Sequence, residues 1–129
     1  MIAHVLTVDG LVLVDLDDEA VLAVEPNAPF EPPARPSLSL PLLVAAAAAG
    51  STVVAVVDTK PPLVVSHDAG RTWRESGRGL PSGRAVAVSA DDPDVVLYAT
   101  RNRLYLSRDG GRFWQSLAVE LPEISALSL

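Results

Sequence analysis

The sequence contains no cysteine, and aromatic residues make up only 5% of its 129 residues. The absence of cysteine excludes disulfide bonds and thiolate metal sites, but it says little about the compartment. The chain begins MIAHVLTVDG, which lacks a basic start and a long apolar run. No signal peptide is therefore predicted, and the cytoplasm is the default expectation. The apolar fraction of 49% is ample for one packed domain.

Basic residues are also scarce, with 10 Lys and Arg against 16 Asp and Glu, so the formal net charge is −6. A net negative charge argues against a general nucleic-acid binder. Residues 1–37 hold seven acids and one base, Arg35, whereas the remaining chain holds nine of each. We interpret this acidic third as a solvated edge of the protein, with an acidic interaction surface as the alternative.

One apolar stretch, LSLPLLVAAAAAGSTVVAVV (38–57), has about the length of a membrane span. Pro41 and the Gly50-Ser51-Thr52 run interrupt it, and no cationic flank closes it. We therefore expect no membrane association. A helix over Ala45–Ala49 is a fair alternative, because alanine is the best helix former.

An eight-residue pattern occurs twice, as SHDAGRTW (66–73) and SRDGGRFW (107–114). GLP (79–81) and ELP (120–122) recur at the same offset as the two copies of this pattern. A period of roughly 40 residues is typical of the four-stranded blades of a β-propeller. In the clearest unit we predict strands at 83–90, 95–100, 104–107 and 112–119. The alanine run holds the first-strand position of the preceding unit, so we predict a strand there, where small side chains suit a crowded axis.

The repeats divide the single domain into five parts. These are a degenerate partial blade (1–25), a proline-rich connecting loop (26–41), two blades with the repeated motif (42–81 and 82–122) and a closing strand (123–129). Three strands are expected at one terminus and one at the other, so the ends are complementary. Because about three blades cannot close a propeller, we predict a homodimer that forms a six-bladed ring, with the terminal strand completing the partner's first blade. The alternative is a fragment or remnant of a longer propeller.

The repeated motif resembles the Asp-box, Ser/Thr-x-Asp-x-Gly-x-Thr/Ser/Phe-Trp, also called the bacterial neuraminidase repeat. The longer unit is similar to repeats of photosystem II assembly and stability factors and of sortilin-type propellers. This resemblance covers roughly residues 42–129 and implies an all-β propeller fold, but the motif occurs in proteins of many functions. The matching residues are Ser66, Asp68, Gly70, Thr72, Trp73, Ser107, Asp109, Gly111, Phe113 and Trp114.

Each of these residue types has a structural task in a tight turn. Gly70 and Gly111 suit positive φ, and Asp68 and Asp109 suit hydrogen bonds to the amides of their own turn. The two tryptophans supply buried area beside the next blade. We therefore assign these residues a structural role and predict no catalytic residue, metal site or cofactor.

The loops opposite these turns hold the candidate ligand residues, which are the cations and one amide expected on a single rim. A homodimer would double them around one axis, and such a cluster suits an anionic small molecule, a glycan or an acidic protein segment. Arg71, Arg108 and Arg112 are expected on the other face. The candidate rim residues are Lys60, Arg78, Arg84, Arg101, Asn102 and Arg103.

The predicted function is therefore non-catalytic binding or scaffolding through this rim. A sialidase-like carbohydrate-active enzyme with a site shared between chains is the alternative, because Tyr98, Tyr105, Glu75 and Glu120 could supply side chains for it. No arginine triad is placed by a motif, which weighs against that reaction. A structural remnant with no ligand is the third interpretation.

Overall fold

The computed structural model describes residues 1–129, which form twelve β-strands in three four-stranded antiparallel sheets. We call the sheets the first, second and third blades, in chain order. The first blade contains β1 (Ile2–Thr7), β2 (Gly10–Asp15), β3 (Ala20–Glu25) and β12 (Ile124–Ser128). The second contains β4 (Leu43–Ala49), β5 (Thr52–Val57), β6 (Leu63–Ser66) and β7 (Arg74–Ser76). The third contains β8 (Ala85–Val88), β9 (Val96–Ala99), β10 (Arg103–Ser107) and β11 (Gln115–Glu120). The architecture is all-β and consistent with propeller-like blades.

The terminal strand closes the first blade of its own chain. β12 pairs with β1 in antiparallel register from His4↔Ser128 to Thr7↔Ile124, which gives the sheet order β12-β1-β2-β3. The expectation that this strand completes a partner's blade is therefore corrected, since the pairing lies within one chain. Loop 121–123 is short and leads β12 directly onto the free inner edge of β1.

The alanine run forms the inner strand β4, and the prediction of a strand is confirmed. Each of Ala45–Ala49 pairs with a residue of β5. The alanine residues have little side-chain area, so pairing with a valine-rich strand overrides their helix propensity. The apolar stretch 38–57 thus contains two short strands, and no helix of the structure is long and apolar enough to cross a membrane.

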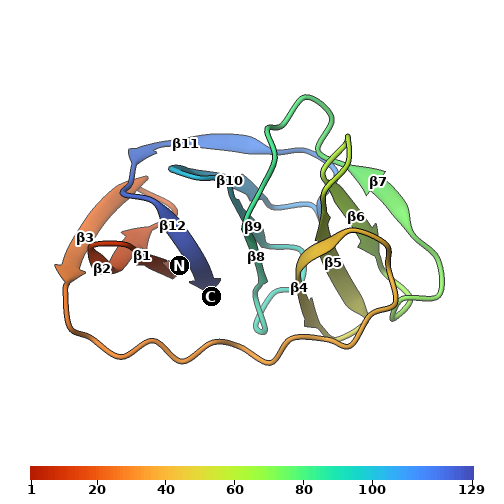
Figure 1. Cartoon of the computed structure of the whole chain (residues 1–129), viewed down its shortest axis with the longest axis horizontal. Helices are drawn as coiled ribbons and strands as arrows, with labels where there is room; N and C mark the ends of the chain where they lie inside the picture. Colours follow the sequence, from red (N-terminus) through yellow and green to blue (C-terminus); the bar gives the residue numbers. More distant parts are fainter.

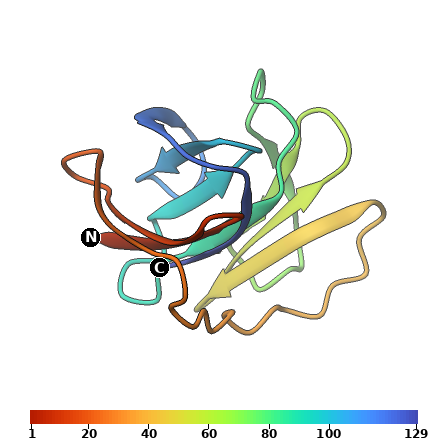
Figure 2. The same ribbon diagram turned by 60° about the vertical axis from the view of Figure 1, so that its left-hand side comes forward.

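The third blade lies between the other two, and the fan of blades stays open on one side (Figure 1). β4 and β5 of the second blade pack against β8, and β12 of the first blade packs against β8 and β9. The two end blades share no comparable contact. Loop 26–42 joins β3 to β4 across the open side without strand pairing (Figures 1 and 2). Residues 29–41 of this loop form no hydrogen bond with either end blade.

Two apolar cores correspond to the two interfaces between blades. Between the second and third blades, Leu63 and Val65 pack against Val96 and Tyr98. Between the third and first blades, Leu104 and Leu106 pack with Val12 and Val14. Leu104 and Leu106 follow Leu63 and Val65 by one repeat period, so each blade directs these positions toward the blade that comes next in the fan. This repeated polarity defines two different faces on every blade.

The fourth strand of the third blade is shorter than the sequence predicts. β11 begins at Gln115 rather than Arg112, and β7 begins at Arg74. The preceding residues belong to the repeated turns, where their amides bond to an aspartate instead of to a neighbouring strand.

Candidate functional site

A cleft lies on the rim of the second blade, opposite its repeated turn. Its volume is about 780 Å³, and Lys60 and Arg78 face it together with one acid, Glu75. Pro61, Gly79, Leu80 and Pro81 complete the lining. Neither Lys60 nor Arg78 forms an ion pair. Two of the six candidate rim residues therefore meet in one cleft with unpaired charges.

A second groove continues from this cleft along the short outer strand β7. Its volume is about 530 Å³, and it shares Glu75 and Arg78 with the cleft. Arg74 and His67 from the second blade and Arg112 from the third blade also line it. Arg112 was expected on the other face, but the gap between the two blades is narrow enough for one groove to hold both Arg78 and Arg112. Arg74 was missed, although its place beside the repeated tryptophan marks it as an outer-strand residue.

We call these two depressions together the β7 groove. Four arginine or lysine side chains line it, and none of them is in an ion pair. β7 is the outermost strand of its sheet, so one edge of its backbone has no partner strand. The basic residues of the groove are Lys60, Arg74, Arg78 and Arg112.

The other candidate rim residues do not join the groove, because they bond to residues 120–123, where the third blade leads into β12 of the first blade. Arg84 bonds to Glu123 at 2.5 Å, and Arg101 lies 3.8 Å from the same carboxylate. The hydrogen bond from Arg84 lowers the pKa of Glu123. Arg103 pairs with Glu120 at 3.2 Å, while the Asn102 amide donates to the Leu121 carbonyl at 2.9 Å. Arg84 and Arg103 are thus each paired with a carboxylate, and Arg101 shares Glu123 with Arg84.

The turn over residues 66–73 is held by the side chains of Ser66 and Asp68. Ser66 Oγ donates to Asp68 Oδ1 at 2.8 Å and accepts from the Gly70 amide at 2.8 Å. Thr72 donates to Asp68 through its amide at 2.9 Å and its hydroxyl at 2.6 Å. These bonds, the Thr72 hydroxyl foremost, lower the pKa of Asp68 well below its usual range. A carboxylate that accepts so many local bonds is fixed as a turn acceptor.

The turn over residues 107–114 repeats this arrangement. Ser107 Oγ donates to Asp109 Oδ1 at 2.8 Å and accepts from the Gly111 amide at 2.9 Å. Asp109 Oδ1 accepts from the amides of Arg112 and Phe113 at 3.1 and 3.0 Å. The Phe113 amide is the main cause of the lowered pKa of Asp109. Phe113 has no hydroxyl, so Asp109 lacks the extra bond that Asp68 receives.

The two tryptophans lie in different surroundings. Trp114 packs into the core between the second and third blades, and its Nε1 donates to Ser76 Oγ of the second blade at 2.9 Å. Its ring centroid lies 6.0 Å from that of Tyr98. Trp114 therefore contacts the preceding blade rather than the next one, which corrects the expected direction. Trp73 is half-buried and has no partner from another blade among the hydrogen bonds and aromatic contacts.

The tyrosines that a sialidase-like reaction would need are parts of this same core. The Tyr98 hydroxyl donates to the Pro81 carbonyl at 2.7 Å, and burial raises the pKa of Tyr98. The centroid of the Tyr105 ring lies 6.1 Å from that of the Tyr98 ring. Of the two acids considered with them, Glu120 is paired with Arg103, and Glu75 alone faces the β7 groove.

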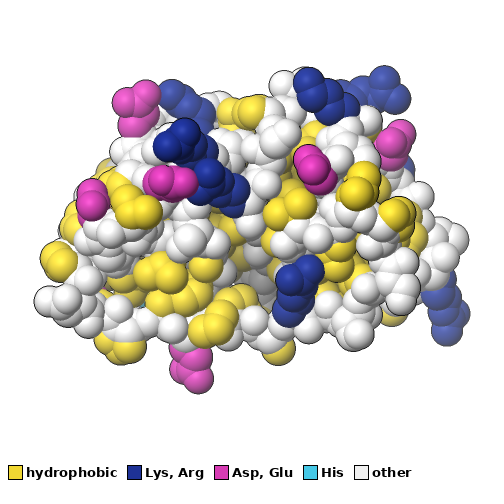
Figure 3. All heavy atoms as spheres, viewed as in Figure 1, with side chains coloured by type: hydrophobic (Ala, Val, Ile, Leu, Met, Phe, Trp, Pro, Cys, Tyr) yellow, Lys and Arg dark blue, Asp and Glu magenta, His cyan; other side chains and the backbone are white.

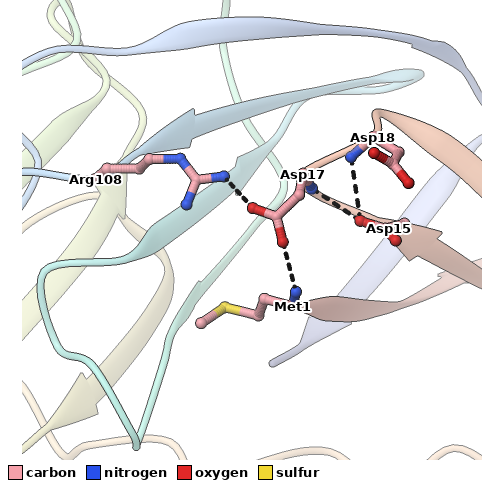
Figure 4. Close-up of polar contacts among 5 residues, drawn as sticks. All are labelled: Met1, Asp15, Asp17, Asp18 and Arg108. Carbon is pink, nitrogen blue, oxygen red and sulfur yellow. Dashed lines mark hydrogen bonds and ion pairs between the residues drawn. The ribbon is translucent and has the colours of Figure 1, made fainter.

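On the turn side of the molecule, a polar cluster ties the first blade to the third (Figure 4). Asp17 accepts from the amino group of Met1 and from Arg108, each at 2.9 Å. The amino group of Met1 is the main cause of the lowered pKa of Asp17. Asp15 Oδ1 accepts from the amides of Asp17 and Asp18 at 2.9 and 3.1 Å. In the first blade, the turn after β2 therefore uses Asp15 and Asp17 as hydrogen-bond acceptors within the chain, and Arg108 is bound to Asp17.

No family model and no curated protein matches the chain. Three chains of solved structures match it, and the two described next each have a TM-score of 0.50. One is described as YCF48 bound to D1 peptide, with 23% identity over 61% of this chain and 26% of that chain. The other is a GH74 enzyme of Niastella koreensis, with 25% identity over 92% of this chain and 17% of that chain. Both neighbours have propeller folds, which supports propeller-like blades here. The chain spans about a quarter or less of their lengths.

Proposed function

We propose that the chain is a non-catalytic binding or scaffolding module whose β7 groove takes an acidic segment of a protein partner. The observation that carries this proposal is the charge of the groove, where four unpaired cations face one carboxylate. The chain as a whole is nevertheless acidic, with a net charge of −6. A basic site on an otherwise acidic protein attracts an acidic ligand, and the remaining surface repels that ligand.

The groove also suits an extended ligand. Arginine side chains bind carboxylates through two parallel hydrogen bonds, and each such charged bond contributes about 1.5–3 kcal/mol. The unpaired edge of β7 can supply backbone bonds to an added strand. One of the structural neighbours is described as bound to a peptide, which is compatible with a protein partner here.

Glycoside hydrolysis is the weaker candidate, although one neighbour is a GH74 enzyme. Hydrolysis by acid and base, or by acid and nucleophile, needs two carboxyl groups about 5–10 Å apart. Glu75 is the single carboxylate of the β7 groove, so the groove favours binding.

The test is titration of the protein with a fluorescein-labelled hexaglutamate peptide, followed by fluorescence anisotropy at low salt. We expect saturable binding that weakens as salt is added, because the attraction is electrostatic. Arg78→Ala is expected to weaken binding about tenfold or more, since Arg78 lines both parts of the groove.

Arg71→Ala is the matched control, because it removes the same charge from an exposed residue of the repeated turn. This control should bind the peptide as the wild type does. Equal loss in both variants would mean that only net charge matters, and unchanged binding by Arg78→Ala would refute the groove as the site.

We further propose that two chains form a six-bladed ring. The open fan supports this, because a propeller needs at least four blades to close. Light scattering on the purified protein is expected to give twice the chain mass of 13.5 kDa. A single-chain mass at every soluble concentration would refute the ring and leave the groove proposal standing.

A further inference from the structure

The second blade has a face that no other blade covers, and the repeat shows what such a face normally contacts. In the third blade, the face with Trp114 packs against the second blade. The side chain of Trp73 has the same place on its own turn, since a Cβ on Gly70 would lie 3.6 Å from its ring and a Cβ on Gly111 would lie 3.7 Å from that of Trp114. Leu63 and Val65 face the third blade, so the Trp73 face is turned to the open side.

The surroundings of the two glycines reveal the missing neighbour directly. A Cβ on Gly111 would lie 3.0 Å from Val65 of the second blade, and Gly111 is buried. A Cβ on Gly70 would meet nothing within 4 Å except Trp73. The position that a preceding blade fills in one repeat is thus open to solvent in the other.

The first blade has the complementary free face. Ala3 and Val5 of β1 point into the core with the third blade, so the alternating residues Ile2, His4 and Leu6 point away from it. Ile2 is 48% exposed. The second and third blades each use the face opposite their Trp face to contact the next blade of the fan. The corresponding face of the first blade has no blade on it.

Exposed apolar side chains gather on the two end blades. Of the nine large ones, only Phe113 belongs to the third blade. In the view of Figure 1, hydrophobic side chains lie mainly across the centre and lower part of the molecule, whereas most charged side chains lie in its upper half (Figure 3). These residues are Met1, Ile2, Val8, Val21, Leu22, Val24 and Val44, with Leu42 at the end of loop 26–42. Val21 and Val24 pair with Val14 and Val12, so these two lie on the face toward the third blade.

The charges of the two end blades are also opposite. Residues 1–25 hold six acids and no base, whereas residues 42–81 hold four bases and three acids. Glu25 pairs with Leu11 in the first blade as Ser76 pairs with Leu63 in the second. Glu25 is therefore the counterpart of Ser76, which accepts the hydrogen bond from the Trp114 ring nitrogen. Its carboxylate is exposed and free of ion pairs, and it can accept from an indole N–H.

We infer that the partner of the Trp73 face is the first blade of a second copy of this chain. Trp73 contacts the partner's copy of the Glu25 strand as Trp114 contacts Ser76 within the chain. Two such interfaces, related by a two-fold axis, close the ring. This inference rests on the proposed ring and specifies which surfaces form it. In the single chain loop 26–42 crosses the open side (Figure 1), so ring closure requires this loop to move aside; residues 29–41 form no hydrogen bond with either end blade that would hold it there.

The test uses one charged substitution on each free face. Ala48→Glu alters the second blade, where Ala48 is exposed and alternates with Ala47 and Ala49, which pack toward the third blade, and Ile2→Lys alters the first. Because each chain contributes both faces, either variant alone damages both interfaces of its own dimer. We expect each to dimerise at least about 100-fold more weakly than the wild type. Phe113→Glu is the control, because it removes a more exposed apolar residue from the third blade and should leave the dimer intact.

Mixing the two variants gives the decisive result. One undamaged first-blade face then meets one undamaged second-blade face, so a 1:1 heterodimer is expected by light scattering and native mass spectrometry. A mixture that stays monomeric would overturn the pairing of unlike faces. A wild-type dimer that both variants retain would overturn the assignment of the faces but not the ring, and a monomeric wild type would refute the ring itself. Circular dichroism of each variant confirms that the fold is kept, as expected for exposed sites.

Discussion

The turn of the third blade and the turn of the second blade have almost the same internal hydrogen bonds and very different surroundings. Ser107 and Asp109 hold the first as Ser66 and Asp68 hold the second. Yet Trp114 is anchored on Ser76 across a blade interface, whereas the side of Trp73 is open. The two turns therefore differ in their contacts with a neighbouring blade and hardly at all in the hydrogen bonds within the turn.

The local bonds determine the shape of the turn. Gly70 and Gly111 both adopt a φ of 89°, although only Gly111 touches another blade. The neighbour instead determines burial and therefore most of the stabilisation, because apolar area removed from water dominates folding free energy. Variants placed at equivalent positions of the two turns can measure each contribution.

The largest expected difference is between the two tryptophans. Trp114→Ala should lower the free energy of unfolding by about 3 kcal/mol, because it empties part of a core and leaves Ser76 without its indole donor. Trp73→Ala should lower it by less than about 1 kcal/mol in single chains, because its ring, although half-buried like that of Trp114, packs in neither core and bonds to no other blade. Urea unfolding followed by circular dichroism, at concentrations where light scattering detects monomers, measures both. Equal losses would contradict the assignment of Trp73 to an open face.

The glycines provide the next comparison. Alanine at either position costs about 1–2 kcal/mol, because an L-residue is strained at positive φ. Gly111→Ala should cost about 1 kcal/mol more, since its Cβ would press on Val65 Cγ2 at 3.0 Å. Thermal unfolding of the two variants gives the difference. If Gly70→Ala proved the more damaging in the dimer alone, the partner blade would be identified as the cause.

Acid should destabilise both turns. The lowered pKa values mean that Asp68 and Asp109 bind a proton more weakly in the folded chain than in the unfolded chain, where the pKa of aspartate is about 3.9. Their stabilisation is complete well above that pH and is lost as the pH falls through the folded pKa values. Urea midpoints between neutral and acid pH should therefore fall less in Asp68→Asn and Asp109→Asn than in the wild type. The flattening should be greater for Asp68→Asn, because Thr72 adds a hydroxyl bond. Parallel curves in all three proteins would contradict this.

Much of the fold could be predicted because the repeat fixes chemistry at each position. The constant offset between the two copies marked both turns, and it assigned the alanine run to an inner strand despite helix propensity. The direction of the terminal strand could not be predicted in this way. β12 is equally complementary to β1 of its own chain and of another, and only the short loop 121–123 beside the third blade shows that it reaches the nearer one.

The candidate site was predicted in part for a similar reason. Lys60 and Arg78 were assigned to one rim from the order of the loops, and the structure brings them into one cleft. Arg84 and Arg103 share that rim, but Glu123 and Glu120 neutralise them, and ion pairs between distant residues leave no mark in a repeat. Arg112 was left out of the candidate rim because the order of the loops assigns each residue to one of two opposite rims. The groove between the second and third blades runs from one rim toward the other, so it is lined by residues of both.

The smallest expected effect comes from making the two turns more alike. Phe113 is 79% exposed and stands where the other turn has Thr72, whose hydroxyl bonds to Asp68 at 2.6 Å. Phe113→Thr would offer Asp109 the same bond while removing little buried area, so stability should rise by at most about 0.5 kcal/mol. The reciprocal Thr72→Val should lower it by a similar amount. Thermal unfolding of both variants measures the pair, with Phe113→Val as the control that lacks a hydroxyl. If Phe113→Val stabilises the chain as much as Phe113→Thr, the gain comes from losing an exposed ring, and the difference between the turns lies entirely in the blade that covers one of them.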